Sequence, residues 1–291
     1  MATIAITGGS GKLGRATLQF LQDRDVPPAT VIPIARDLAK VSDLTARGFQ
    51  TRHGDYTDPA SLEKAFQGVD KLLFISTSVV GEERLRHHRN VVDAAKRAGV
   101  KSILYTSVIK PAPAAKFGAA PGHFHTEALI HDSGIPYSFF RNNLYADIIP
   151  FVFAAAVETG TLLHSAGEGR IGFVPRDDMA QGLANALVSA SPLQPSYAIT
   201  VSRPCYGLAE VAAALAKASG KPVQYESVSP EEFRRVLERR GVPEPGIGMS
   251  IAMGDAIRAG EFDASSQDLE TLIGRAPIAL EPFLTRLLGQ R

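Results

Sequence analysis

Apolar segments alternate with amphipathic helical segments along the first half of the chain. The apolar segments predict strands at residues 3–7, 30–35, 50–53, 71–76, 101–106 and 136–140. Glycines stand just past the helical segments, where a left-handed helix cap is favourable. These glycines are Gly48, Gly68, Gly99 and Gly134. The alternation predicts an α/β fold with a doubly wound parallel sheet and right-handed crossovers.

The pattern changes beyond about residue 150. Amphipathic helices are predicted at residues 208–219, 230–240, 251–259 and 279–288, after a hairpin-like segment at residues 161–174. Short strands at residues 197–201 and 223–227 are expected either to rejoin the sheet or to form a small ribbon. The Pro/Gly-rich segment 241–248 predicts a mobile loop that borders the substrate cleft. We therefore expect a sheet domain at 1–150 and a smaller, mostly helical C-terminal substrate lobe at 151–291, with an interleaved boundary.

The first predicted strand runs directly into a glycine-rich turn and a helix start. The turn comprises Gly8, Gly9, Ser10, Gly11, Lys12, Leu13 and Gly14. Gly9, Gly11 and Gly14 have the G-x-G-x-x-G spacing of the dinucleotide-binding fingerprint. In that fingerprint Gly11 lets the main chain approach a pyrophosphate, and Gly14 lets the helix pack closely. The free N–H groups at the helix start then face the phosphates, and Lys12 adds positive charge.

Ligands bind at the carboxyl ends of the strands in a doubly wound sheet, so the residues after each strand are candidates for cofactor binding. Arg36 follows the second strand. A guanidinium suits the 2′-phosphate of NADP, whereas NAD enzymes usually carry an acid there for the ribose hydroxyl. The neighbouring Asp37 is better explained as a helix N-cap. The sequence thus predicts NADP(H) in preference to NAD(H).

Two further loops are expected to contact the same cofactor. Asp55 and Tyr56 follow the third strand, and the Asp55 carboxylate is expected to accept a hydrogen bond from the adenine amino group. Ser76, Thr77 and Ser78 follow the fourth strand. These small hydroxyl residues are expected beneath the nicotinamide ribose, where a bulky side chain would block the dinucleotide.

Composition excludes several other classes of function. The chain has 31 basic and 30 acidic side chains and no Lys/Arg run that would follow a phosphate backbone, so no nucleic-acid partner is expected. Cys205 is the single cysteine, which excludes an internal disulfide and favours a reducing compartment. No targeting or membrane-spanning segment is apparent, so we expect a cytoplasmic protein. The histidine spacings do not suit a metal, and the oligomeric state is not indicated.

Several short motifs, in this order, resemble the NmrA-like group of atypical short-chain dehydrogenases and reductases. They are residues 8–14, Arg36, Gly54-Asp55-Tyr56, Leu73-Phe74-Ile75-Ser76, Tyr105-Thr106-Ser107, His123-x-x-Thr126-Glu127 and Arg141-Asn142-Asn143. The resemblance covers nearly the whole chain and is strongest to the branch of NAD(P)H:quinone oxidoreductase 2 and triphenylmethane reductase. It implies a Rossmann sheet that binds NADP(H) and a flat aromatic acceptor, a quinone or a dye.

The chain lacks the Tyr-x-x-x-Lys motif of mainstream short-chain dehydrogenases. Ser107 ends the fifth strand, but His123 and Glu127 stand where the tyrosine and lysine would be. A carboxylate cannot lower a tyrosine pKa as the lysine does, which disfavours carbonyl–alcohol chemistry. Quinones and cationic dyes need less assistance, because hydride transfer gives a hydroquinone anion or a neutral leuco dye.

Two interpretations of His123 follow from its position. It is expected either to hydrogen-bond a quinone oxygen or to be a packed structural histidine, and in neither case to be an obligatory acid. Glu127 is expected to bond to the backbone or to a neighbouring hydroxyl.

The segment after the sixth strand is expected to contribute both cofactor and acceptor contacts. The resemblance implies that Arg141, Asn142 and Asn143 lie against the nicotinamide, with an asparagine that holds its carboxamide. Tyr145 and Phe151 are expected to line the acceptor pocket, although aromatic residues on such a helix are more often part of a core.

The favoured function is an NADPH-dependent oxidoreductase that reduces quinones or related electron-poor aromatics. The alternative, also implied by the NmrA-like resemblance, is a regulatory protein that senses NADP(H) without turnover. The small residues at the ribose site and an aromatic-lined second lobe favour the enzyme, because a sensor needs no acceptor pocket. An isoflavone-reductase-like or sugar-nucleotide enzyme is disfavoured, since the former requires a lysine near position 127 and the latter a Tyr-x-x-x-Lys motif.

Overall fold

The computed structural model describes residues 2–289, which form two compact units. The first unit contains the chain up to Pro113 together with Pro121–Asn142 and Met179–Tyr197. The second unit contains Ala114–Ala120, Asn143–Asp178 and the chain from Ala198 on. The two units therefore interleave along the sequence. No helix among the described residues is both long enough and apolar enough to span a membrane.

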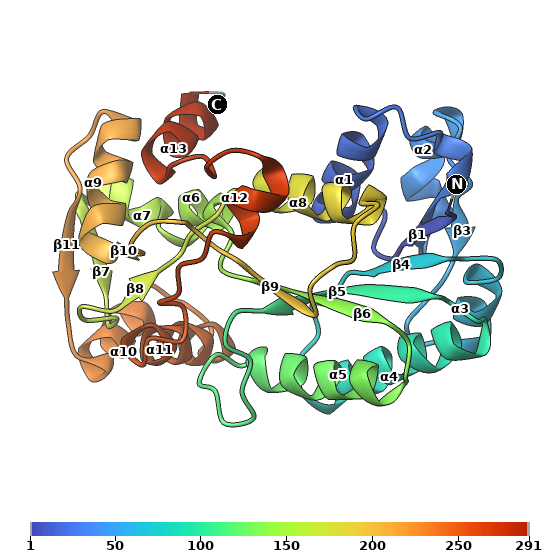
Figure 1. Cartoon of the computed structure of the whole chain (residues 1–291). Helices are drawn as coiled ribbons and strands as arrows, with labels where there is room; N and C mark the ends of the chain where they lie inside the picture. The colour runs from blue at the N-terminus through green and yellow to red at the C-terminus, as the bar shows by residue number, and fades with distance from the viewer. Residues whose placement is uncertain (1, 290–291) are drawn as a thin grey trace. The chain divides into compact units, whose positions relative to one another are not determined.

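A seven-stranded sheet forms the centre of the first unit, in the order β3-β2-β1-β4-β5-β6-β9 (Figure 1). Its strands are β1 (Ile4–Ile6), β2 (Val31–Ala35), β3 (Arg52–His53), β4 (Lys71–Phe74), β5 (Ser102–Val108), β6 (Tyr137–Asn142) and β9 (Ser196–Ile199). The strands from β3 to β6 pair in parallel, with Ile4 opposite both Val31 and Lys71. This order, with helices between the strands, confirms the predicted doubly wound α/β fold.

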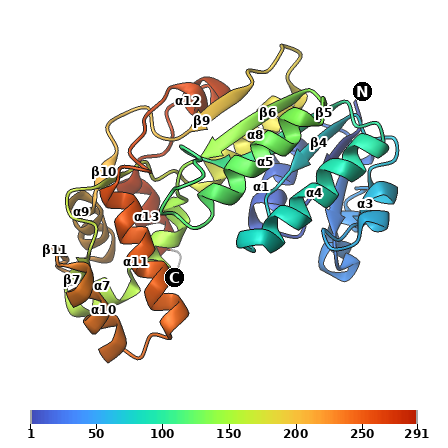
Figure 2. The same ribbon diagram turned by 90° about the horizontal axis from the view of Figure 1, so that it is seen from below.

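Helices cover both faces of this sheet, so its central strands are apolar throughout. In Figures 1 and 2, α1 (Lys12–Gln22) and α8 (Arg176–Val188) lie on one face, and α3 (Pro59–Ala65), α4 (Gly81–Arg97) and α5 (Ala120–Asp132) lie on the other. All five residues of β2 are buried, as expected for a parallel strand covered on both sides. Phe66, Phe74 and Tyr105 are the largest fully buried side chains in the core beneath α3, α4 and α5.

Caps mark the ends of several helices, and those predicted at Asp37 and at the four glycines are confirmed. The Asp58 carboxylate accepts hydrogen bonds from the N–H groups of Ala60 and Ser61, and Pro59 opens α3. Asp37 accepts from the N–H of Ala39 at the start of a short 3-10 helix, Leu38–Val41, which leads into α2 (Ser42–Ala46). The four glycines predicted to end helices all have positive φ angles, from +72° to +88°.

The second unit is mostly helical and carries two small ribbons. β7 (Thr161–His164) pairs in parallel with β11 (Gln224–Ser227), and β8 (Arg170–Ile171) pairs antiparallel with β10 (Tyr206–Gly207). The helices are α6 (Ile149–Val152), α7 (Ala154–Thr159), α9 (Leu208–Ser219), α10 (Pro230–Arg239), α11 (Glu244–Arg258), α12 (Asp268–Ile273) and α13 (Leu280–Gly289). A short 3-10 turn at Ala146–Ile148 precedes α6, and another, at Pro28–Thr30, lies in the first unit.

Two expectations for the second unit are wrong. Residues 161–174 do not form a hairpin, because β7 and β8 each pair with a strand from far along the chain. The segment between them packs under α11 instead, where a Cβ on Gly169 would lie 2.4 Å from the carbonyl oxygen of Ile257. Residues 241–248 are not one loop, since α11 begins at Glu244 with Pro245 in its first turn, a position that favours helix initiation.

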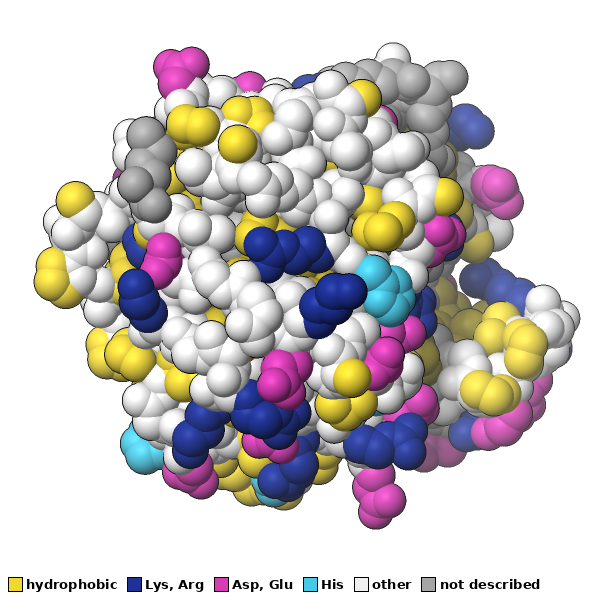
Figure 3. All heavy atoms as spheres, turned by 90° about the vertical axis from the view of Figure 1, so that its right-hand side faces the viewer, with side chains coloured by type: hydrophobic (Ala, Val, Ile, Leu, Met, Phe, Trp, Pro, Cys, Tyr) yellow, Lys and Arg dark blue, Asp and Glu magenta, His cyan; other side chains and the backbone are white. Residues whose placement is uncertain are grey.

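Charged side chains of both signs lie mixed on the face of the molecule that carries α2 and α3 (Figure 3). No single-sign region covers this face, in keeping with the net charge of +1.

The close approach of α1 to the glycine turn gives a first prediction. A Cβ on Gly14 would lie 2.4 Å from the Gly8 carbonyl oxygen, which is backbone and cannot move aside alone. Gly14→Ala is therefore expected to lower the free energy of unfolding by about 1 to 3 kcal/mol, the usual cost of overpacking. Urea unfolding measures it, with Gly11→Ala as the control, because that Cβ would meet only the Gly8 oxygen at 3.2 Å. Wild-type stability for Gly14→Ala would contradict the prediction.

Candidate functional site

The carboxyl ends of β1, β2, β3 and β4 meet at one pocket of the first unit. Its lining comes from the glycine turn, from the loops that follow the strands and from α4. The lining residues are Gly8, Ser10, Gly11, Ile34, Ala35, Arg36, Gly54, Asp55, Tyr56, Ile75, Ser76, Thr77, Ser78, Val79 and His87. The structure thus brings together residues from four of the five segments that the sequence predicts to bind the cofactor, and the segment at Arg141–Asn143 does not line this pocket.

The glycines of the turn divide into two kinds. Gly8 has a φ of +64°, and a Cβ on Gly9 would lie 2.9 Å from Pro33 of β2, so these two serve the turn and its packing. Gly14 lies in the first turn of α1 and allows this helix to approach the Gly8 carbonyl, as described above. Gly11 lines the pocket and meets no atom but the Gly8 oxygen. Protein packing alone does not require Gly11 to be glycine, whereas close approach of a phosphate would.

Lys12 and Leu13 do not line the pocket with their side chains. Leu13 is buried in the core, and Lys12 is exposed on the first turn of α1. What this segment presents is the amino end of α1, whose first N–H groups have no partner within the helix. The structure therefore supports backbone N–H groups, and not side chains, as what Lys12 and Leu13 offer to a cofactor.

Arg36 is exposed at the end of β2 and lines the pocket, with Asp55 across from it on the next loop. Burial alone would raise the pKa of the Asp55 carboxyl, but the Thr57 N–H and hydroxyl bond to it, and the positive charge of Arg36 acts in the same direction. Together they hold the pKa of Asp55 below its usual value. Asp55 is accordingly ionised, with its Oδ1 atom used to fix the turn at Thr57.

Tyr56 presents its ring, and not its hydroxyl, to the pocket. The hydroxyl oxygen lies 2.6 Å from both the Thr7 Oγ1 atom and the Ile75 carbonyl oxygen. It thus ties β1 to the end of β4, and burial raises the pKa of the phenol so that it stays neutral. The Tyr56 ring meets Phe74 edge to face, with 5.7 Å between ring centroids.

His123 is buried, and both of its ring nitrogens contact protein groups. It is 6% exposed, and its ring lies between two other buried side chains. Its Nε2 atom is 2.7 Å from Nη2 of Arg84, and its Nδ1 atom is 2.8 Å from the Tyr105 hydroxyl. Burial, with the positive charge of Arg84, lowers the pKa of His123 well below 6.5, so the ring is neutral. Of the two interpretations of His123, these contacts favour the packed structural histidine, and a contact with the acceptor stays a prediction.

Arg141 is likewise apart from the pocket. Its guanidinium donates two hydrogen bonds to the Glu127 carboxylate, at 3.0 and 2.7 Å, which raises the pKa of Arg141. This bidentate pair lines a different hollow, beside α5, with Tyr137 and Phe139. The expectation that Glu127 bonds to backbone or a hydroxyl is wrong, whereas the role of Arg141 beside the nicotinamide stays a prediction.

The two asparagines that end β6 differ in their surroundings. The Asn143 amide donates to Thr200 Oγ1 at 3.1 Å and to the Phe262 carbonyl at 2.9 Å, and its oxygen accepts from the Leu144 N–H. Asn143 thus bonds to three groups of the second unit, and its role as a carboxamide ligand stays a prediction. Asn142 Oδ1 and Ser107 Oγ are buried polar atoms at the carboxyl ends of β6 and β5, and neither has a partner among the described residues.

The two expected acceptor contacts lie in the second unit. The Arg176 guanidinium lies 5.2 Å from the centre of the Tyr145 ring and is held by the Asp147 carboxylate at 2.7 Å. Phe151 is 66% exposed on α6, next to Val152, which is 59% exposed. Helix α6 therefore presents two adjacent apolar side chains to its surroundings, and the acceptor role of Tyr145 and Phe151 stays a prediction.

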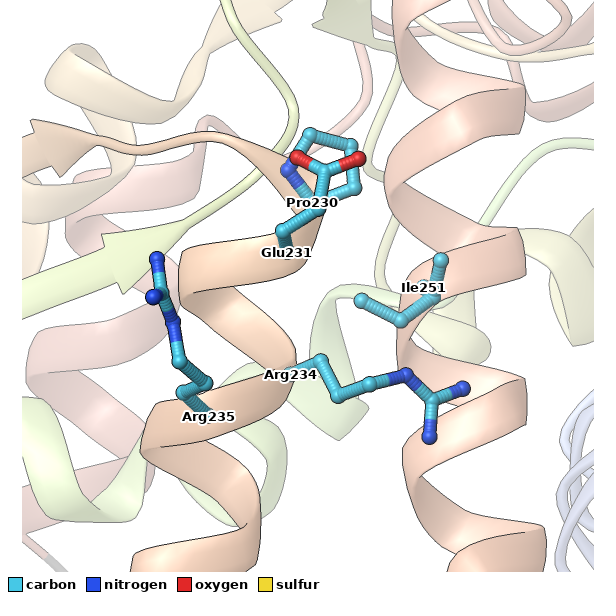
Figure 4. A pocket seen from close by; sticks show the side chains of 5 residues that line it. All are labelled: Pro230, Glu231, Arg234, Arg235 and Ile251. Atoms are coloured by element: carbon cyan, nitrogen blue, oxygen red, sulfur yellow. The ribbon is translucent and has the colours of Figure 1, made fainter.

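A separate hollow of the second unit lies between α10 and α11. In Figure 4, Arg234 reaches toward Ile251 of α11, whereas Arg235 points to the other side of α10. Arg234 donates to both oxygens of the Glu244 carboxylate, at 2.9 and 3.0 Å. Because this pair neutralises the arginine, the hollow has little to attract an anion, and we assign it no ligand.

The sequence matches the NmrA-like family over residues 1–282. The chain belongs to the NmrA-like family. This family member is 38% identical over 288 residues to quinone oxidoreductase 2 of Escherichia coli K12, covering 98% of this chain and 99% of that protein. It is 30% identical over 241 residues to the NAD(P)H azoreductase of Xenophilus azovorans, covering 83% of this chain and 82% of that protein.

Solved structures of NmrA-like proteins match over almost the whole chain. The E. coli NADPH-dependent quinone oxidoreductase in complex with NADPH has a TM-score of 0.91 at 36% identity, covering 98% of this chain and 99% of that one. The Citrobacter sp. triphenylmethane reductase in complex with NADP(H) has a TM-score of 0.90 at 37% identity, with the same coverage. Both the family resemblance and the Rossmann-like fold predicted from the sequence are confirmed.

Sequence reasoning missed the buried side chains behind the pocket of this NmrA-like protein. Arg84 and His88 lie four residues apart on α4, on the same stripe as Val91, Val92 and Ala95. A polar pair in register with an apolar helix stripe is a signal visible in the sequence. It indicates side chains that enter the core and must find partners there.

Three buried histidines predict that the protein loses stability in mild acid. Burial lowers the pKa of His88 to about 2 and that of His164 to about 4, and it lowers that of His123 well below 6.5. The unfolded chain binds these protons as the pH falls through about 6.5, while the folded chain does not, so stability falls below that pH.

Each such histidine is expected to remove up to about 1.4 kcal/mol per pH unit between pH 6 and 5. Urea unfolding at pH 7.5, 6 and 5 measures this loss. His164→Phe removes one titrating group beside Phe233 and should flatten the dependence. Equal stability at pH 7.5 and 5 would be incompatible with three neutral buried histidines.

Proposed function

We propose that this NAD(P)H-dependent oxidoreductase binds NADP(H) in the pocket beside the glycine turn and transfers hydride to a quinone or a related electron-poor aromatic. One observation carries the proposal: the pocket joins Gly11 and the amino end of α1 to Arg36 in a chain 38% identical to quinone oxidoreductase 2 along its length. The relatives named as an azoreductase and a triphenylmethane reductase support the same class of acceptor.

The residues of the pocket fit a dinucleotide phosphate. Gly11 leaves space against the main chain, and the first N–H groups of α1 point to where a pyrophosphate would lie. Arg36 supplies a positive charge for a 2′-phosphate, and Asp55 and the Tyr56 ring border the side where an adenine would lie. Serine and threonine at 76–78 keep the opposite wall small. This arrangement supports NADP(H) over NAD(H).

The chemistry proposed for this site needs no proton donor from α5. NADPH, when bound, supplies a hydride to the acceptor. His123 is neutral, and both of its ring nitrogens are occupied, while Glu127 is paired with Arg141. Neither side chain can take the part of a tyrosine–lysine pair. A quinone or a cationic dye suits such a site, because water protonates the hydroquinone anion and a leuco dye is already neutral.

Two parts of the chain are candidates for orienting the nicotinamide and the acceptor. Asn142 Oδ1 and Ser107 Oγ are buried and unpartnered, and both stand at strand ends beyond Ser76. They suit the amide of a nicotinamide. Tyr145 and Phe151 of the second unit provide aromatic surface for a flat acceptor.

The cofactor preference is tested by reversing one charge. Arg36→Glu is expected to weaken NADPH binding by roughly 1 to 3 kcal/mol, because a charge-assisted contact with the 2′-phosphate is lost, and to leave NADH binding nearly unchanged. Fluorescence titration with both cofactors measures the effect. Lys64→Glu, an exposed position outside the pocket, is the control for the change in net charge. Equal dissociation constants for NADPH and NADH in the wild type would refute the preference.

A turnover assay distinguishes the proposed reductase from the alternative, a protein that senses NADP(H) without turnover. Steady-state oxidation of NADPH is expected with 1,4-benzoquinone and with a triarylmethane dye, with kcat showing no inflection near the histidine pKa, since no histidine donates a proton. Protein that binds NADPH but oxidises it with neither acceptor would favour the NADP(H)-sensing alternative. A kcat that follows a single ionisation near pH 6.5 would contradict the reaction without a protein acid.

A further inference from the structure

We infer that Arg84 and His88 of α4 position the Thr77–Val79 wall of the pocket, and that His123 and Thr126 of α5 orient these two side chains. The inference deepens the proposed function and rests on it, because the wall is part of the NADP(H) pocket. Every contact that carries it lies within the first unit.

His88 holds the first residue of the wall. The Thr77 N–H donates to Nε2 of His88 at 3.1 Å, and Nδ1 of His88 lies 2.8 Å from Thr126 Oγ1. The Thr126 hydroxyl donates its own proton to the Gly122 carbonyl at 2.7 Å, so its oxygen accepts from His88. The two hydrogen bonds of the His88 ring therefore fix one tautomer, with the proton on Nδ1 and the lone pair of Nε2 directed at the Thr77 N–H of the wall.

Arg84 holds the other end of the wall. It is 3% exposed, and its Nη1 atom donates to the Val79 carbonyl at 3.0 Å. Its Nη2 atom donates to Nε2 of His123, whose Nδ1–H therefore donates to Tyr105. The stem of Arg84 is confined as well, because a Cβ on Gly122 would lie 2.5 Å from its Cδ atom. The guanidinium thus has one orientation, toward Val79.

Burial of the Arg84 charge would cost free energy if the side chain served only to fill the core. Arg84 forms no ion pair with a carboxylate within residues 2–289, and its Nε atom has no hydrogen-bond partner there. An apolar side chain of similar volume would avoid the desolvation of a buried charge. The polar groups that this charge reaches include the Val79 carbonyl of the wall, His123 and the Tyr105 hydroxyl. A role at the pocket explains why the cost is tolerated.

The same geometry gives a role to three α5 residues, two of which, His123 and Glu127, stand where a tyrosine and lysine would be in mainstream relatives. His123 aims Arg84, Thr126 aims His88, and Glu127 holds Arg141. All three act on the protein, and none is directed at an acceptor. A wall whose backbone is already fixed does not have to be ordered when the cofactor binds. The effect of the network should therefore appear in cofactor affinity and not in the hydride step.

The test compares two substitutions at His88. His88→Leu removes the acceptor for the Thr77 N–H, and it is expected to raise the Kd for NADPH at least fivefold, as loss of about one positioned hydrogen bond would. His88→Gln keeps an acceptor at a similar reach and should stay within twofold of wild type. With saturating NADPH, kcat and the KM for 1,4-benzoquinone should stay within twofold in both variants. If His88→Leu fails to fold, Thr126→Val, which releases the ring, replaces it.

Val92→Ala is the matched control, since Val92 lies on the same helix, is buried in the core and does not line the pocket. It should lower the Tm while the Kd for NADPH stays within twofold. Hydrogen exchange of the peptide that spans residues 76–79 supplies a readout without cofactor, and it should be faster in His88→Leu and unchanged in Val92→Ala.

Unchanged exchange in His88→Leu, equal losses of affinity in the Leu and Gln variants, or the same loss in Val92→Ala would each overturn the inference. A wild-type protein that does not bind NADPH, with faster exchange in His88→Leu, would refute the proposed function and leave the positioning of the wall standing.

Discussion

The contact between the amino end of α1 and the Gly8 carbonyl is the constraint on which the pocket depends. Gly14 brings the helix so near that a single methyl group would lie 2.4 Å from that oxygen. This closeness fixes where the first N–H groups of α1 point, and Gly9 packs the same turn against β2. With the turn fixed in this way, Gly11 is left as the one glycine of the fingerprint that faces the pocket.

A second layer behind the pocket is built from buried polar side chains without a carboxylate at its centre. Arg84, His88, His123 and Tyr105 meet between α4, α5 and the sheet. Burial lowers the pKa values of Arg84 and both histidines and raises that of Tyr105, so every acid–base group except the guanidinium is held neutral. Such a layer orients hydrogen bonds, but it offers no group that gives or takes a proton near neutral pH.

The residues near the glycine turn were predictable because their positions follow from local spacing and from one rule, that parallel strands present their carboxyl ends together. The segment after β6 was not, because it depends on which way each side chain leaves its strand. Arg141 shares a face with Phe139 and Tyr137, two and four residues before it, and so turns toward Glu127 of α5. The pairings of β7 and β8 join segments far apart in sequence, which no local pattern reveals. Helix α8 is absent from the sequence predictions, although the four-residue spacing of the buried side chains Met179, Leu183 and Leu187 is typical of an amphipathic helix.

The absence of a proton relay among these side chains bears on which acceptors suit the site. Where a protein acid must protonate the product, the acceptor has to place one atom beside that acid, and the range of substrates narrows. Where solvent supplies the proton, the requirements reduce to an electron-poor centre within reach of the hydride and a surface on which a flat molecule can lie. Relatives named for a quinone, an azo compound and a triphenylmethane dye differ in the atom that is reduced but share an extended π-system. We therefore expect selection among acceptors to depend on their shape and aromatic surface, and not on a catalytic acid in the first unit.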